Sequence, residues 1–216
     1  MFKQVGDKQL LAFSSLILAN VLHEHGDQSE AHALLEQSIS TSYEIGSKYN
    51  LAFSSRILGD MMRAEGDEAS ALELVEKSLD LFRGIGDKYG VAFGLSVLAN
   101  IVHEQGEHQR AGSLFKESLA LRAEIGDKHG MIECGEGLAR VLLAQNHPKR
   151  AARLLGAAEA LRDSLTIPLS PIEQTKWDRA KTAARAALDD DRFAADWERG
   201  RAMTLEEVIV EALGNR

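Results

Sequence analysis

The sequence has little of several features on which other classes of protein depend. Its 216 residues include one cysteine, Cys134, so no internal disulfide can form, and only three prolines. No apolar run approaches the length that spans a bilayer, and the N-terminal stretch MFKQVGDKQL lacks the apolar core of a secretory signal peptide. The sequence therefore favours neither a disulfide-stapled secreted protein nor a membrane-spanning one, and the expected compartment is the cytoplasm.

An excess of positive charge is also lacking. The formal net charge is -8 at pH 7, and no block of lysines or arginines compensates for it locally. A surface that binds nucleic acid needs basic side chains to neutralise phosphates, and so does one that binds an anionic membrane. Direct binding of nucleic acid or membrane is therefore not expected. With 44% hydrophobic residues, the chain is long and apolar enough for one sizeable core.

What the sequence does contain is an internal repeat. The motifs VGDK, IGSK, IGDK and IGDK place glycines at positions 6, 46, 86 and 126, a period of 40 residues. Halfway between them lie glycines at 26, 66 and 106, and then Asn146. Glycine and asparagine readily adopt the left-handed conformation that ends a helix, so each unit is predicted to be a pair of helices. The predicted repeats are 7–46, 47–86, 87–126 and 127–166, and residues 1–6 align with the end of a second helix.

Alignment of the four units shows which positions the fold needs. A leucine followed by a small residue recurs in the first helix, at Leu18, Leu58, Leu98 and Leu138 with Ala19, Gly59, Ala99 and Ala139. An alanine recurs in the second helix, at Ala31, Ala71, Ala111 and Ala151. Small residues on two helices allow a close crossing, and the leucines are expected to fill the space around it.

This pattern of a leucine–small pair and a later alanine resembles a tetratricopeptide repeat over residues 1–166. The tryptophan-like position of the first helix departs from the family, with Ser15, Ser55, Leu95 and Gly135. The GDK junctions and the tail AARLLGAAEALRDSLTIPLSP resemble the variant of about forty residues found in the C-terminal arms of bacterial signal-transduction ATPases and LuxR-type regulators. The resemblance implies an all-α, right-handed superhelical solenoid of stacked helical hairpins.

Residues 167–216 are predicted to be capping helices. Pro168 and Pro171 bracket a break, and Thr204 with Glu207 forms a capping box that begins the last helix. A stack of hairpins leaves an apolar face at its end. Three aromatic residues of the tail are suited to cover it, namely Trp177, Phe193 and Trp197.

The stretch NIVHEQGEHQRAG at 100–112 resembles part of a zinc-enzyme motif. Because Gly106 ends a helix, His103 and His108 are expected on different helices, whereas HExxH chemistry needs two histidines on one helix. His23 occupies the same repeat position as His103, but a whole repeat separates them by roughly 20 Å. The histidines are therefore predicted to be structural, with no metal or other cofactor. A weak two-ligand site at His103 and His108 is the open alternative.

No catalytic constellation is predicted either. The sequence has no G-x-S-x-G motif and no glycine-rich phosphate loop, and Cys134 lies within a helical repeat. Glu133 and Glu136 lie one turn apart, a spacing more typical of a solvated helix face than of an acid/base pair. The chain is therefore expected not to be an enzyme.

The resemblance implies instead a binding surface on the first helix of each repeat, facing a concave groove. The residues carried over are Phe13, Asn20, His23, Phe53, Arg56, Asp60, Arg63, Phe93, Asn100, His103, Glu136 and Arg140. Amide side chains there would bond the backbone of an extended peptide, and the rings would take its apolar groups. The open alternative is that the phenylalanines pack between adjacent first helices.

The expected function is a non-catalytic protein-interaction or regulatory sensor module, the repeat arm of a bacterial signalling or transcription regulator. The alternative is a cytoplasmic receptor that binds a peptide or small effector in the groove. The expected partner is a protein or peptide in that groove. Because the alignment has the chain begin inside a repeat, an apolar face with Leu10, Phe13 and Ile17 lacks a neighbour, so a homodimer through the N-terminal end is also expected.

Overall fold

The computed structural model describes residues 2–214, and the side chains in that range except at positions 2–5, 24, 171 and 172. The described residues form eleven helices and no strand, which confirms the predicted all-α class. The helices are α1 (Phe2–His25), α2 (Gln28–Ile45), α3 (Lys48–Glu65), α4 (Glu68–Ile85), α5 (Lys88–Glu104), α6 (His108–Ile125), α7 (Lys128–Ala144), α8 (Pro148–Leu165), α9 (Pro171–Ala186), α10 (Asp190–Arg201) and α11 (Leu205–Leu213). Within the described range, none of them is both long and apolar enough to cross a lipid bilayer.

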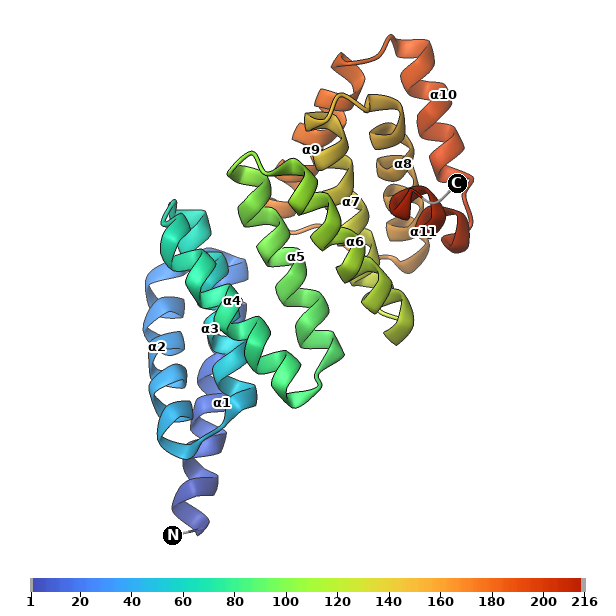
Figure 1. The fold of residues 1–216 in the computed structure, drawn as a ribbon. Helices are drawn as coiled ribbons and strands as arrows, with labels where there is room; N and C mark the ends of the chain where they lie inside the picture. The colour runs from blue at the N-terminus through green and yellow to red at the C-terminus, as the bar shows by residue number, and fades with distance from the viewer. Residues whose placement is uncertain (1, 215–216) are drawn as a thin grey trace. The chain divides into compact units, whose positions relative to one another are not determined.

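The helices form two compact units, Met1–Ile101 and Val102–Arg216. In the first unit α1 packs on α2 and α3 packs on α4, and both α1 and α2 contact α3. In the second unit α6 packs on α7 and α7 on α8, while α9, α10 and α11 lie around α8 (Figure 1). The pairs α1 and α2, α3 and α4, and α7 and α8 therefore form helical hairpins.

The junctions between helices follow the predicted chemistry. Gly46 has a φ of 70°, and the N–H of Ser47 donates to the carbonyl of Ser42 across a distance of 2.9 Å, which closes the last turn of α2. Asn146 takes the place of glycine at the end of α7 with a φ of 61°. The left-handed helix ends predicted from the repeat are therefore confirmed at these positions.

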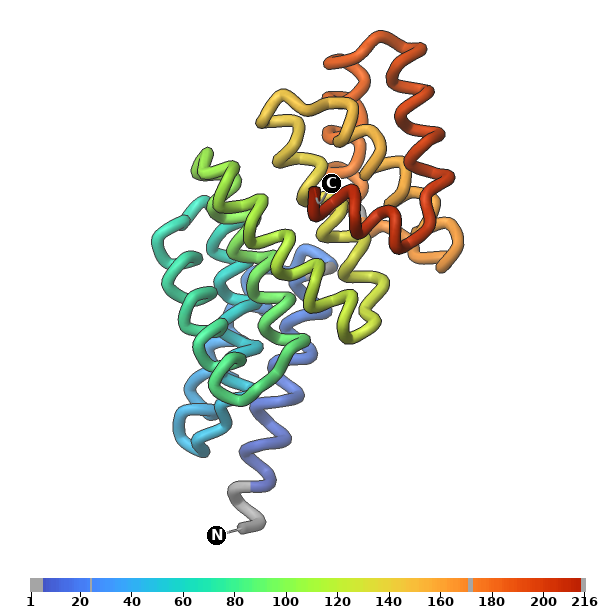
Figure 2. The backbone as a smooth tube through the Cα atoms, turned by 45° about the vertical axis from the view of Figure 1, so that its right-hand side comes forward, coloured from blue at the N-terminus to red at the C-terminus, as the bar shows by residue number. Residues whose placement is uncertain are grey.

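Gly6 is an exception, and the predicted helix end there is wrong. Helix α1 (Phe2–His25) includes Gly6, which is not among the glycines with positive φ. Figure 2 shows the blue part of α1 as one continuous helix. A left-handed helix end needs the carbonyls of a preceding helical turn and usually a packed apolar contact. The helical backbone of α1 continues through Gly6, so the carbonyls of the preceding turn are not left to close such an end.

The repeated small residues lie at the hairpin crossings as predicted. The second-helix alanines Ala31, Ala71, Ala111 and Ala151 are all fully buried. A Cβ atom on Gly59 of α3 would overlap Val75 of α4, so the two backbones approach closely there.

The recurring leucines of the first helices differ in burial from one repeat to another. Leu58 clusters with residues of α1 and α2, the preceding hairpin. Leu18 is 47% exposed, so its predicted place in the core is wrong.

At each junction between consecutive repeats, a residue near the end of one helix packs against a residue near the start of the next, and one of the two is large where the other is small. Phe82, near the end of α4, packs against Gly90 of α5, and Arg122, near the end of α6, packs against Gly130 of α7; in both cases a Cβ on the glycine would overlap the large side chain. One repeat earlier the same positions hold the small Ser42 and the larger Asn50, both buried. The larger side chain therefore lies on the earlier helix at two junctions and on the later helix at the first junction.

The C-terminal helices cover the hairpin of α7 and α8. Trp177, Phe193 and Trp197 are buried as predicted, with the Phe193 and Trp197 ring centroids 5.2 Å apart. Glu159 of α8 accepts from the indole N–H of Trp197 at 3.2 Å and from Lys181 Nζ at 3.1 Å. The predicted capping box of Thr204 and Glu207 is present at the start of α11.

Candidate interaction surface

Three residues of the predicted groove come together in the first unit. The Asp60 carboxylate of α3 lies 3.7 Å from Nε2 of His23 on α1 and 2.8 Å from Nη2 of Arg63. The nearby Asp60 carboxylate raises the pKa of His23 above its ordinary value, and partial burial opposes the rise. His23 also contacts Gln28 through Nδ1 at 2.8 Å. These three residues, which the resemblance places in the groove, form a polar network that joins α1 to α3.

A second contact joins α3 to α5. The guanidinium carbon of Arg56 lies 4.0 Å from the centroid of the Phe93 ring, a cation–π arrangement. Phe53 lies edge-on to Phe82 of α4, with centroids 4.7 Å apart. Phe53 and Phe93 are half-buried, Arg56 is buried and Phe13 is 44% exposed. The rings are thus partly packed within the fold and partly open to solvent.

Two exposed tyrosines on this surface were missed by the sequence analysis. Tyr49 packs on Phe53 with centroids 4.6 Å apart, and Tyr89 packs on Phe93 at 6.2 Å. Each pair is spaced four residues apart, so both rings lie on one helix face. The signal was present in the sequence, since a KY dipeptide follows the glycine junction in both repeats. The two pairs place aromatic surface on successive first helices.

The recurring asparagines Asn20 and Asn100 are both half-buried. The side-chain amide of Asn100 donates to the carbonyl of Ser96 on its own helix at 3.0 Å. The expectation that a polar amide in an apolar stripe needs a partner is met there by the local backbone.

In the second unit the two histidines of the stretch NIVHEQGEHQRAG are brought together across a helix junction. His103 lies in the last turn of α5 and His108 begins α6, with their Nδ1 atoms 3.2 Å apart. Burial is the main cause that lowers the pKa of His103 to about 4, and the nearby charge of Arg140 adds to it. His103 is therefore neutral at pH 7, and one ring N–H can be shared between the two nitrogens.

Glu136 forms an ion pair with Arg162 of α8. The guanidinium of Arg162 lies 4.9 Å from the centroid of the Trp177 ring. This predicted groove residue is thus tied to the packing of the C-terminal helices.

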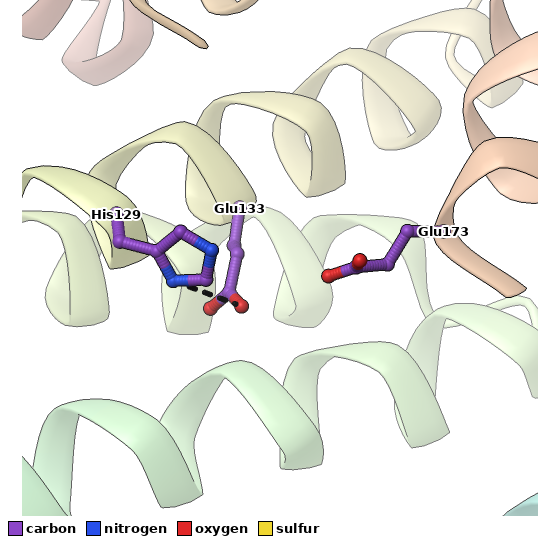
Figure 3. Close-up of side chains that lie close together, drawn as sticks. All are labelled: His129, Glu133 and Glu173. Atoms are coloured by element: carbon purple, nitrogen blue, oxygen red, sulfur yellow. Dashed lines mark ion pairs between the residues drawn. The ribbon is translucent and has the colours of Figure 1, made fainter. Parts of the chain in front are cut away.

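One cluster in the second unit has side chains that metals use. His129 and Glu133 lie one turn apart on α7, and Glu173 approaches from α9; one ligand atom of each lies within 4.8 Å of the others (Figure 3). Both carboxylates already have donors. Arg122 Nη2 lies 3.3 Å from Glu133, and the Ser170 N–H donates to Glu173 at 2.7 Å. A cation would compete with a buried guanidinium, so we interpret the cluster as an ion-pair network.

Cys134 is buried beside this network. Burial raises the pKa of its thiol to about 11, and its Sγ donates to the hydroxyl of Ser118 at 3.2 Å. A nucleophilic or redox-active cysteine needs an accessible thiolate at neutral pH. The surroundings of Cys134 therefore suit a packed core residue.

Comparison with known proteins identifies the repeat. Residues 50–124 and 90–164 match the tetratricopeptide repeat family. Together the two matches cover more than half of the chain. No curated protein sequence matches it.

Several solved structures share the fold. One is the crystal structure of TPR-like repeats, nearly identical to one another, from a Podosopora anserina protein described as a kinesin light chain. Its sequence is 21% identical to this chain, and the TM-score is 0.57 over 88% of this chain and 96% of that one. A variant of those repeats gives 22% identity and a TM-score of 0.60, over 88% and 92% of the two chains. BtubC (BKLC) from P. vanneervenii gives 17% identity and a TM-score of 0.65, over 99% and 89%.

Proposed function

Because this chain belongs to the tetratricopeptide repeat family, we propose that it acts as a non-catalytic module that binds an extended segment of another protein. The observation that carries the proposal is a packed tyrosine–phenylalanine pair on each of two successive first helices, α3 and α5. We call the pairs Tyr49–Phe53 and Tyr89–Phe93 the aromatic ladders. Tyr49 and Tyr89 are each about half exposed, and each is held against a phenylalanine four residues further along. Rings fixed in this way offer apolar surface at little cost in side-chain entropy.

Polar groups of the same surface would fix the orientation of a bound peptide. The network of His23, Asp60 and Arg63 lies on α1 and α3, and Asn100 lies on α5. Groups of this kind orient the backbone amides of a bound segment, while the rings take its apolar side chains. The proposed ligand is therefore an extended peptide that carries apolar residues and has little net charge, because the polar groups of this surface include both signs.

A matched set of variants tests the surface. Proteins captured from the native cytoplasm by the full chain would be identified, and the affinity of the strongest partner measured. The double variant Tyr49→Ala/Tyr89→Ala should weaken binding at least about tenfold, since buried interface aromatics commonly contribute 2 kcal/mol or more. Tyr43→Ala is the control, because Tyr43 is equally exposed but lies on α2, a second helix. Equal weakening by both variants, or by neither, would show that the ladders are not the binding surface.

The finer role we propose is that of the repeat arm of a bacterial signalling or transcription regulator, acting in the cytoplasm. The support is the resemblance of the GDK junctions and the C-terminal tail to such arms. A gene that joins this chain to an ATPase or DNA-binding domain would support the role. A receptor for a small effector is the second candidate, and stabilisation by a metabolite in a thermal-shift screen would favour it.

A further inference from the structure

Helix α1 carries an apolar face that nothing in the described structure covers. Its exposed apolar residues are Leu10, Leu11, Phe13, Ile17, Leu18 and Val21, between 44% and 69% exposed. At about 100° per residue they lie on the side of the helix opposite to the buried Ala12, Leu16 and Ala19. No charged residue occurs between Lys8 and His23. A helix that is apolar all round is one that proteins bury on all sides.

The later repeats show what kind of surface fits this face. Leu11, Ile17, Leu18 and Val21 correspond to Leu51, Ile57, Leu58 and Met61 of α3, none of which is more than 8% exposed. In α3 these positions are covered by α1 and α2, which are apolar helices of the preceding hairpin. The complement of the α1 face is therefore another apolar helical surface.

We propose that this surface is the same face of a second copy of the chain, with α1 packed antiparallel on α1 about a twofold axis. The six side chains expose roughly 500 Å² per copy, so pairing would bury about 1,000 Å², the size at which specific interfaces begin. A head-to-tail contact is excluded, because α9 and α10 already pack on the last hairpin and their own aromatic residues Trp177, Phe193 and Trp197 are buried.

An antiparallel register matches five of the six apolar residues of the face, and Leu11 would then lie opposite the half-buried Asn20. Setting Leu10 against Val21 of the second copy also sets Phe13 against Leu18 and Ser14 against Ile17. Ser14 is exposed, and its hydroxyl donates to the Leu11 carbonyl of its own helix at 3.0 Å. A small residue with a satisfied hydroxyl can be buried at a close helix crossing without an unpaired polar group.

Light scattering and sedimentation of the full chain at micromolar concentration test the pairing. We expect a dimer. Ile17→Glu should raise its dissociation constant at least about tenfold while leaving the circular dichroism unchanged, because a carboxylate would be buried without a partner. Leu10→Gln is the milder second variant if Ile17→Glu fails to fold. Neither residue belongs to the peptide surface, so this test is independent of the proposed function.

Val210→Glu is the matched control, because Val210 is 54% exposed on α11 and should have no effect on association. A strict monomer in the wild-type chain would overturn the proposal, since the face would then stay uncovered or await a different partner. Dimers that persist in both α1 variants would also overturn it, because the copies would then pair elsewhere.

Discussion

A Cβ atom on Gly200 of α10 would overlap the backbone carbonyl of Arg153 on α8, so the two helices touch backbone to backbone. Gly200→Ala should therefore lower the free energy of unfolding by at least about 1 to 3 kcal/mol, because the helices must separate. Gly84→Ala is the control: Gly84 is also helical, has no atom near an added Cβ, and should stabilise by up to about 1 kcal/mol. Urea denaturation of the two variants measures the contrast.

The repeat register makes a second prediction, on two residues of α5. Leu98 is buried, so Leu98→Ala should cost about 2 to 5 kcal/mol of unfolding free energy. Asn100 is half-buried and its amide donates to the carbonyl of Ser96 on its own helix, so Asn100→Ala should cost less than about 1 kcal/mol. Chemical denaturation checks both, and the reverse order would show that the register is wrong.

The buried ion pair of α6 and α7 gives a third prediction. Arg122 is almost fully buried and lies near both Asp127 and Glu133. Arg122→Phe should cost up to about 3 kcal/mol, because it leaves the partly buried carboxylates of Asp127 and Glu133 without their guanidinium. The double variant Arg122→Phe/Glu133→Phe should recover most of that loss, because the corresponding positions one repeat earlier are Phe82 and Phe93. A double-mutant cycle by thermal or urea unfolding tests the coupling.

Stability should depend on pH through His103. Its pKa in the folded chain is lowered from 6.5 to about 4, so protonation favours the unfolded chain. The stability that neutral His103 provides is present above pH 6.5 and is lost as the pH falls towards 4. Between pH 7 and pH 5 the loss should be roughly 1 to 2 kcal/mol. His103→Asn should abolish this part of the pH dependence, and an equal slope in the variant and the wild type would contradict the assignment.

Chelators should leave the melting temperature unchanged. The carboxylate of Glu133 in the cluster with His129 and Glu173 is already paired with Arg122, so a metal would have to displace a guanidinium. Differential scanning calorimetry with and without EDTA checks this. A fall of several degrees on chelation would show that the cluster, or the pair His103 and His108, holds a metal ion.

The period of 40 residues was enough to predict the class of fold, because it appears in the sequence as glycines, alanines and leucines at fixed spacing. Ala31 and its three equivalents are buried because a larger side chain would separate the helices of each hairpin. The alignment failed at Leu18 and Gly6, because α1 does not make the contacts that the corresponding later residues make. Leu58 clusters with residues of α1 and α2, whereas Leu18 is exposed, and the helix that ends at Gly46 in α2 continues through Gly6 in α1.

The surface was harder to predict, because a repeat position specifies a location on a helix and not the partner of a side chain. The alignment placed His23, Asp60 and Arg63 on one face, and their ion pairs agree with that placement. It did not identify Tyr49 and Tyr89, because family resemblance supplied the positions and this chain adds aromatic residues at others. Nor did it predict that Arg122 is buried, since an arginine within a helix is usually solvated.

The larger side chain of each repeat junction lies on the earlier helix at some junctions and on the later helix at another. This difference restricts which whole repeats the gene can lose without loss of packing. Removing residues 87–126 would bring Phe82 next to Gly130, a large side chain beside a glycine, as in the intact chain. Removing residues 47–86 would instead bring Ser42 next to Gly90, where no side chain is large enough to fill the space. Two deletions of identical length, both in frame and both preserving the period of the helices, would therefore leave one junction packed and the other with a cavity.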